Sequence, residues 1–131
     1  MKADLIATRQ NLIEGQTHAL EAAEASLAHA QSAACLHAFL QLTPESLIAS
    51  ATHPGALQRP LAGLAVSVKD LFDVAGQVTT AGSVVLQNQP AAQQDAPVIA
   101  RLRAAGAGFI GRTNMVAVSY THLTLPTNRE V

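Results

Sequence analysis

Two short apolar segments, residues 63–70 and 107–110, enclose the clearest helical pattern in this sequence. The first segment consists mostly of small and β-branched residues, a composition typical of a buried strand. Between the two segments, residues 95–106 carry helix signals at both ends, with Asp95 as the expected N-cap and Gly106 as the expected stop. Strand, helix and strand in this order predict one right-handed crossover between parallel strands. We therefore expect an α/β protein.

Helices are predicted for most of the first third of the chain. Residues 5–13 and 20–34 carry apolar side chains at helical spacing. Gly15 is the expected stop of the first helix, because glycine accepts the left-handed conformation that follows many helix ends. The hydroxyl of Thr17 is expected to cap the second helix. The second helix is amphipathic with a thin, alanine-rich contact face, and we expect it to need a partner surface for stability.

The segment that follows is less regular. Residues 36–42 form a short apolar run to which the pattern assigns no element. Another helix is expected from Pro44, with Thr43 as its cap, because proline suits the first helical turn. The residues 53–55 (His-Pro-Gly) should end it, and residues 51–62 are predicted to be mainly an irregular linker.

Composition and charge exclude several classes of function. Eight basic and nine acidic residues give a net charge of −1, so we expect no basic surface for nucleic acid or an acidic membrane. No apolar run is long enough to predict a membrane span. Cys35 is the single cysteine and the five histidines lack ligand spacing, so neither a disulfide, a metal nor another cofactor is predicted. This composition favours a reducing, cytoplasmic location.

Lys69 is the main candidate for chemistry, because it ends an apolar segment and precedes Asp70. The local sequence leaves two interpretations open, a solvated lysine at a strand end or a lysine held in a polar site. Desolvation disfavours the charged amine, and a neutral amine can act as a base. Residues 78–83, rich in glycine and hydroxyl groups, also have two interpretations. They form either a cradle of backbone N–H groups for an anion or a reacting carbonyl, or a plain turn.

Three blocks of sequence point to a known family. They are residues 60–76 (PLAGLAVSVKDLFDVAG), 79–83 (TTAGS) and 95–115 (DAPVIARLRAAGAGFIGRTNM). In order and spacing these blocks resemble the N-terminal part of the amidase-signature family of serine hydrolases. The resemblance implies N-terminal helices followed by the start of a mixed-sheet core that is incomplete in this chain. Residues 1–117 are accordingly expected to be the truncated N-terminal part of an amidase domain.

The resemblance also implies a catalytic set of a lysine, a serine in a cis peptide and a nucleophilic serine. The family's lysine corresponds to Lys69, which would take a proton from the bridging serine. Both serines belong to a downstream segment, rich in glycine and serine, that this sequence lacks, so the chain as given is expected to be inactive. Ser67 shares a strand face with Lys69 but does not match the nucleophile. The residues expected to support the lysine are Ser67, Asp70, Thr79, Thr80, Gly82, Ser83 and Asn114.

The implied activity is hydrolysis of a linear carboxylic amide, a small molecule, to an acid and ammonia or an amine through an acyl-serine intermediate. One alternative is the glutaminase-type subunit of a tRNA-dependent amidotransferase, in which partner subunits would hold the tRNA. Another is a related ureido-amide hydrolase. Leu71 stands where many members carry asparagine, which leaves the subfamily open. From a different class, residues 3–34 alone would suit a non-catalytic helical interaction module. A pseudogene product without function is the remaining alternative.

The sequence departs from the family pattern after Met115, where members continue with one variable residue and then Glu-Phe-Ala. Residues 118–131 instead resemble translated sequencing-adapter DNA of the kind found in assembled environmental reads. We expect this tail to be foreign to the protein. The alternative is a divergent strand and turn that belongs to it.

Overall fold

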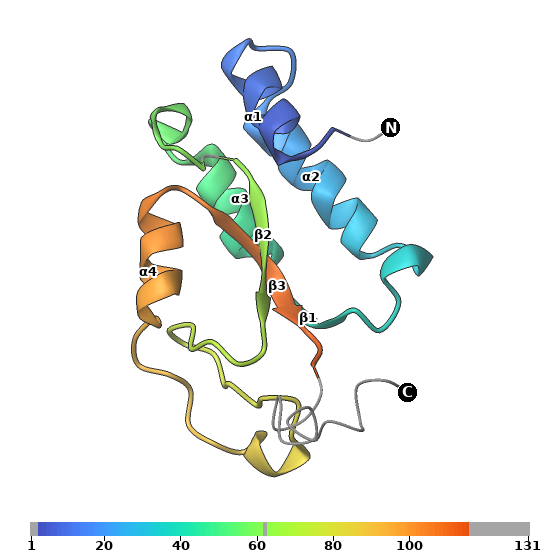
Figure 1. Ribbon diagram of the computed structural model, residues 1–131, viewed down its shortest axis with the longest axis vertical. Helices are drawn as coiled ribbons and strands as arrows, with labels where there is room; N and C mark the ends of the chain where they lie inside the picture. The colour runs from blue at the N-terminus through green and yellow to red at the C-terminus, as the bar shows by residue number, and fades with distance from the viewer. Residues whose placement is uncertain (1–2, 62, 116–131) are drawn as a thin grey trace, which may run out of the picture.

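The computed structural model describes residues 3–61 and 63–115, which form a small mixed sheet with helices on both faces (Figure 1). The predicted α/β class is confirmed, while residues 116–131, with the tail 118–131, lie outside the described residues. The α-helices are α1 (Leu5–Ile13), α2 (Ala19–Ala30), α3 (Pro44–Thr52) and α4 (Pro97–Ala104), and the strands are β1 (Phe39–Leu42), β2 (Ala65–Lys69) and β3 (Gly108–Thr113). Short 3-10 helices cover Ala33–Cys35 (η1), Ala56–Gln58 (η2) and Val84–Leu86 (η3).

The central strand of the sheet is β3, in the order β1-β3-β2. It runs parallel to β2, so that Ala65 lies beside Gly108 and Lys69 beside Thr113. Because α4 separates β2 from β3 in the sequence, the predicted strand, helix and parallel strand are confirmed. On its other side β3 is antiparallel to β1, a strand within the apolar run 36–42 that the sequence pattern did not assign.

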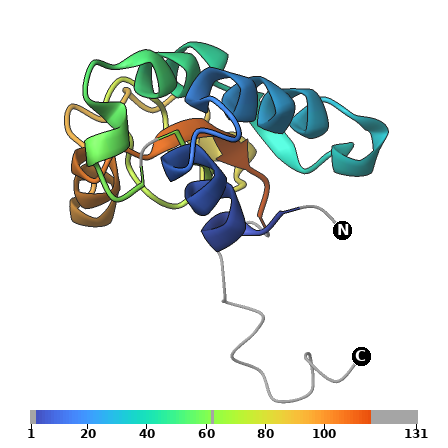
Figure 2. The ribbon, with the colours of Figure 1, turned by 90° about the horizontal axis from the view of Figure 1, so that it is seen from above.

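Two hydrophobic clusters hold the helices against the two faces of the sheet. Figure 2 shows α2 and α3 side by side over one face, where their side chains pack against Ile110 of β3. On the other face, Ile99 of α4 packs against Phe109 of β3 and Val68 of β2. Phe109 and Ile110 are consecutive, so they point to opposite faces of the strand. Both clusters together position the end of β2 at which Lys69 lies.

Glycines in β3 allow its neighbours to approach closely. A Cβ atom on Gly108 would lie 2.7 Å from Cδ1 of Leu47 in α3. A Cβ atom on Gly111 would collide with the carbonyl oxygen of Gln41 in β1. These glycines therefore have a packing role, and at Gly111 the close approach of β1 to β3 leaves no room for a side chain.

Replacing Gly111 by alanine should destabilise the full-length protein by roughly 1–3 kcal/mol, because the added methyl group overpacks the contact between β1 and β3. The measurement is the denaturant midpoint of both proteins. Gly76→Ala measures backbone strain without overpacking, since a Cβ atom there meets nothing within 4 Å but φ is 82°, whereas Gly111 is not among the glycines with positive φ. Equal stability of the Gly111→Ala protein and the parent would contradict the packing role.

Predicted helix caps are wrong at two places. The N-cap of α2 is His18 rather than Thr17, and the helix ends at Ala30, earlier than the pattern indicated. The N-cap of α4 is Ala96 rather than Asp95. The carboxylate of Asp95 instead pairs with a side chain in the last turn of that helix. Cap signals fail here because a nearby polar or charged group outside the cap position offers each side chain a better partner.

Candidate functional site

Lys69 is the last residue of β2, and its side chain is exposed. Val66 and Val68 pack into the cluster under α4, so the alternation of the strand turns Ser67 and Lys69 to the opposite face. Ala65 on this face packs against the α2 and α3 cluster, whereas Ser67 and Lys69 lie beyond that cover and are exposed. Within residues 3–61 and 63–115 the amine of Lys69 has no hydrogen bond or ion pair, so in this part of the chain it is solvated.

Asp70 points the other way and is buried, with 2% of its surface exposed. One carboxylate oxygen lies 2.8 Å from Nη2 of Arg112, whose side chain is also buried. The Nε atom of Arg112 donates to the same oxygen at 3.3 Å, and Nη1 donates to the carbonyl oxygen of Phe72 at 2.7 Å. This buried ion pair therefore links the turn after Lys69 to the central strand.

The segment 79–83 wraps around the carboxylate of Asp70. The backbone N–H groups of Thr80 and Gly82 donate to its two oxygens at 3.3 and 3.4 Å, and the Thr80 hydroxyl donates as well. Between them Ala81 has a φ of 49°, and Gly82 follows with 69°, so both residues are left-handed. Backbone N–H groups that converge in a tight turn form a concave anion site. Of the two interpretations of this segment, the cradle of N–H groups therefore applies, and the anion that it binds is the carboxylate of Asp70 in the same chain.

Hydrogen bonding keeps Asp70 ionised despite its burial. Burial disfavours the charged carboxylate, but the Thr80 hydroxyl, the Arg112 guanidinium and the N–H groups of Thr80 and Gly82 outweigh it. Together they hold the pKa of Asp70 below its usual value. Asp70 is thus an anion committed to structural partners, and it does not contact the amine of Lys69.

The lowered pKa of Asp70 predicts a dependence of stability on pH. Because the pKa is lower in the folded than in the unfolded protein, its contribution is complete above about pH 4, the unfolded value, and is lost as the pH falls further. Asp70→Asn should therefore destabilise the full-length protein most near pH 7, and the difference from the parent should shrink between pH 4 and 3. Denaturant midpoints measured from pH 7 to 3 test this. A difference that stays constant over the range would show that the charge of Asp70 is not responsible.

The remaining predicted site residues fall into two groups. Thr79 joins the Asp70 cluster, since its hydroxyl donates to Asp73 at 2.8 Å and accepts from Arg112 at 3.3 Å. Ser83 lies at the edge of the cluster, where its N–H bonds to the carbonyl oxygen of Thr80. Asn114 is exposed beyond β3, and its side chain accepts from the N–H of the next residue. The structure therefore brings together Asp70, Thr79, Thr80 and Gly82, and it separates Ser67, Lys69 and Asn114 from them.

Sequence analysis missed Arg112, although it is the centre of this cluster. The only signal was a charged residue inside an otherwise apolar segment. Strict alternation along β3 would place Arg112 on the face of Ile110, away from α4. An irregularity in the register with β2 instead puts Phe109 beside Val66 and Arg112 beside Val68, so both lie on the α4 face. A bulge of this kind re-aims a side chain, and it cannot be located from the sequence.

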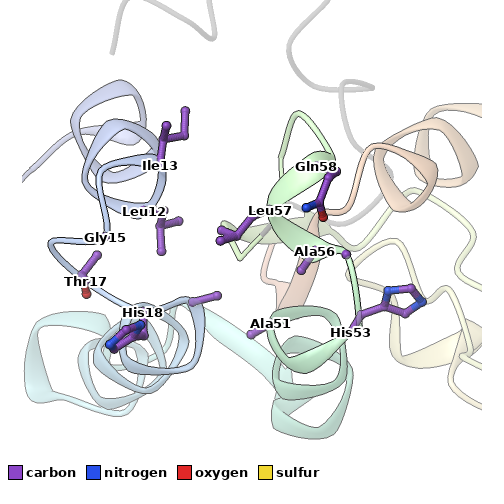
Figure 3. A pocket seen from close by; sticks show the side chains of 12 residues that line it. Leu12, Ile13, Gly15, Thr17, His18, Ala51, His53, Ala56, Leu57 and Gln58 are labelled. Atoms are coloured by element: carbon purple, nitrogen blue, oxygen red, sulfur yellow. The ribbon is translucent and has the colours of Figure 1, made fainter.

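A hollow of about 500 Å³ elsewhere in the molecule offers no comparable chemistry (Figure 3). It lies between α1 and the 3-10 helix η2, with Leu12, Ala56 and Leu57 toward its centre. His18 and His53 lie at opposite sides of it and do not approach each other. In the described part of the chain, no group of three or more potential metal ligands is found, and no helix is long and apolar enough to cross a membrane.

Comparison with known proteins gives the evolutionary context of this arrangement. The sequence matches the Amidase family model over residues 21–126. A glutamyl-tRNA(Gln) amidotransferase subunit of Bordetella avium (strain 197N) is 40% identical over 116 residues, which cover 85% of this chain and 22% of that protein. The chain belongs to the amidase family. A second member is AtzE of Pseudomonas sp. (strain ADP), a 1-carboxybiuret hydrolase subunit, which is 43% identical over 74 residues, covering 56% of this chain and 16% of that protein.

Solved structures of other amidases have the same fold. One is an inhibitor-bound structure from work on a vestigial protein complex and the evolutionary origins of an s-triazine catabolic enzyme. It superposes with a TM-score of 0.81 and 34% sequence identity, and the match covers 88% of this chain and 27% of the solved chain. The native peptide amidase from Stenotrophomonas maltophilia superposes with a TM-score of 0.74 and 27% sequence identity, and the match covers 87% of this chain and 25% of the peptide amidase chain. The resemblance seen in the sequence is therefore confirmed. This amidase chain spans about a fifth of the length of its Bordetella relative.

Proposed function

We propose that this chain is the N-terminal part of an amide hydrolase in which Lys69 is the general base. The amine of Lys69 takes a proton from a bridging serine, which takes one from the nucleophilic serine hydroxyl. The serine oxygen then bonds to the amide carbon, the C–N bond breaks, and the leaving nitrogen departs with a proton as ammonia or an amine. Water hydrolyses the acyl-serine to the acid and restores the serine. Both serines belong to the part of the parent protein beyond Met115.

The observation that carries this proposal is the setting of Lys69. Its amine is exposed on a sheet face that α2 and α3 leave uncovered at this end. Asp70, the nearest carboxylate in sequence, is fully engaged with Arg112 and the 79–83 loop on the other face. A base needs access to the group that it deprotonates, and no partner in the described residues occupies Lys69. Family membership supports an amide as the substrate class, and we expect a cytoplasmic enzyme acting on a small molecule.

The proposal extends to the domain organisation of the chain. Residues 1–117 would be the truncated amidase domain, and residues 118–131 would be adapter-derived sequence, although the family match runs into this tail. The chain as given would then have no amidase activity, because it lacks both serines. It would also expose sheet edges and apolar faces that the rest of the domain covers, which favours aggregation.

The decisive experiment is to sequence the source gene beyond the Met115 codon and to express the full-length parent. We expect the frame to continue into Glu-Phe-Ala and then into a glycine- and serine-rich segment with a serine pair. The full-length parent should release ammonia or an amine from a panel of amides, while the 131-residue chain releases none. If genomic DNA encodes residues 118–131 and then a stop codon, the hydrolase proposal fails. A helical interaction module, or no function, would then be the better hypothesis.

A second candidate, the glutaminase subunit of a tRNA-dependent amidotransferase, is supported by the similarity to the Bordetella protein over most of the chain. The two candidates differ in what the parent needs for activity. A free-standing amidase hydrolyses simple amides alone, whereas a glutaminase subunit would prefer glutamine and depend on partner subunits with charged tRNA. Assaying the parent on glutamine, carboxybiuret and simple carboxamides, with and without such subunits, separates them.

A further inference from the structure

We infer that Arg112 is a positioning residue for Lys69, an inference that rests on the proposed role of Lys69 as the base. Arg112 touches no part of the exposed face on which the amine lies. It acts on the backbone that carries Lys69, from the opposite side of the sheet. Its role in the reaction is to hold the Cα atom of Lys69 in position, so that the amine is presented correctly.

The contacts of Arg112 join three segments of the chain. From β3 its guanidinium reaches the carboxylate of Asp70 and the carbonyl oxygen of Phe72, both in the turn that follows β2. It also reaches the hydroxyl of Thr79 at the start of the 79–83 loop. Since Asp70 is itself bound by that loop, Arg112 closes a single hydrogen-bonded unit of strand end, turn and loop.

Lys69 lies between two residues that this unit and the core hold in place. On one side Val68 is 4% exposed and packs under α4, and on the other Asp70 is buried in the ion pair. The carbonyl oxygen of Lys69 accepts the N–H groups of Leu71 and Phe72 at 2.7 and 3.2 Å, which makes a tight turn directly after it. Arg112 bonds to the far end of that turn. The Cα of Lys69 therefore cannot move without breaking the Arg112 contacts.

An arginine is required by the geometry of these acceptors. Three of its nitrogen atoms donate to a carboxylate, a carbonyl and a hydroxyl that lie in different directions. A planar guanidinium presents five donors in a fixed fork, whereas a lysine ammonium is a single point charge. Lysine at position 112 would keep the charge balance with Asp70 but would lose the simultaneous hold on the turn and the loop.

The test uses the full-length parent with four variants: Arg112→Lys, Lys69→Ala, the double variant, and Arg103→Lys as a matched control. Arg103 also pairs with an aspartate at 2.8 Å, but its side chain is 46% exposed and far from Lys69 in the chain. Rates are expressed per folded protein, with the folded fraction of each variant taken from circular dichroism, so that the normalisation does not depend on the Lys69 base. We expect Arg112→Lys to lower kcat by about 10- to 100-fold with KM nearly unchanged, as for a misplaced catalytic group. Arg103→Lys should leave kcat unchanged.

The double variant separates positioning from a purely structural role. If Arg112 acts through Lys69, replacing it should have no further effect on the residual rate once Lys69 is alanine. The inference would be overturned if the double variant lost activity by the product of the two single losses. It would also be overturned if Arg112→Lys had the same kcat per folded protein as Arg103→Lys. If Lys69→Ala itself leaves kcat unchanged, the proposed function fails, and this outcome is distinct from a failure confined to Arg112.

Discussion

Replacing Lys69 by alanine in the full-length parent should lower kcat by about 10²- to 10⁴-fold, the usual contribution of a general base. Lys69→Arg should lose as much, because a guanidinium stays protonated and cannot accept a proton from serine. The measurement is the steady-state rate of ammonia or amine release, with the folded fraction checked by circular dichroism. This pair of variants separates proton transfer from charge, since arginine keeps the positive charge.

Arg101→Ala is the matched control for Lys69. Arg101 is an exposed cation in α4, and its removal should change kcat little. A Lys69→Arg protein that keeps most of its activity would contradict the role of Lys69 as a base. Equal losses in Lys69→Ala and Arg101→Ala would show that the net positive charge, rather than one amine, is what matters.

The second large effect concerns stability. Arg112→Ala should destabilise the full-length parent by about 3–5 kcal/mol, because it leaves the buried carboxylate of Asp70 without its counter-charge. The measurement is the shift of the denaturant midpoint at pH 7. This large loss of unfolding free energy is expected because the two charges lie close together and are buried. The side chains of Arg112 and Asp70 are 4% and 2% exposed.

The more exposed pair of Arg103 and Asp95 provides the comparison. Its hydrogen-bond distance is the same 2.8 Å, but Arg103 is 46% exposed. Arg103→Ala should therefore cost about 1 kcal/mol through loss of its ion pair, because water reaches the guanidinium, and about 0.5–1 kcal/mol more through loss of its contact with the Phe109 ring. Similar midpoint shifts for Arg103→Ala and Arg112→Ala would mean that burial does not govern the strength of the Asp70 pair.

The order of the elements could be predicted from the chain because it depends on local signals. The apolar segments 63–70 and 107–110 contain β2 and the first half of β3, and the helix predicted between them became α4. Gly15 follows the end of the first helix with a φ of 71°, as glycine was expected to do. Thr43 occupies the N-cap of α3 as predicted, but its hydroxyl donates to the carbonyl oxygen of Phe109 in β3. A local signal thus gave the position but not the partner.

Contacts between distant segments could not be predicted in this way. The strand β1 has only four residues. It approaches β3 closely at Gly111, which lies 72 positions after Phe39 in the sequence. Arg112 escaped notice because a register irregularity in β3 turns it to the face opposite to that given by alternation. Both features arise from how β3 fits between its neighbours, which local sequence does not encode.

The sequence by itself determined the α/β class, the family and Lys69 as the candidate base, because periodicity, turn residues and motif spacing are properties of short segments. Only the tertiary structure decided that the anion cradle of residues 79–83 holds Asp70, and that Arg112 completes it. It also decided which face of β2 leaves Lys69 exposed. These outcomes depend on strand register and on burial, which are fixed when segments far apart in the chain exclude water between them.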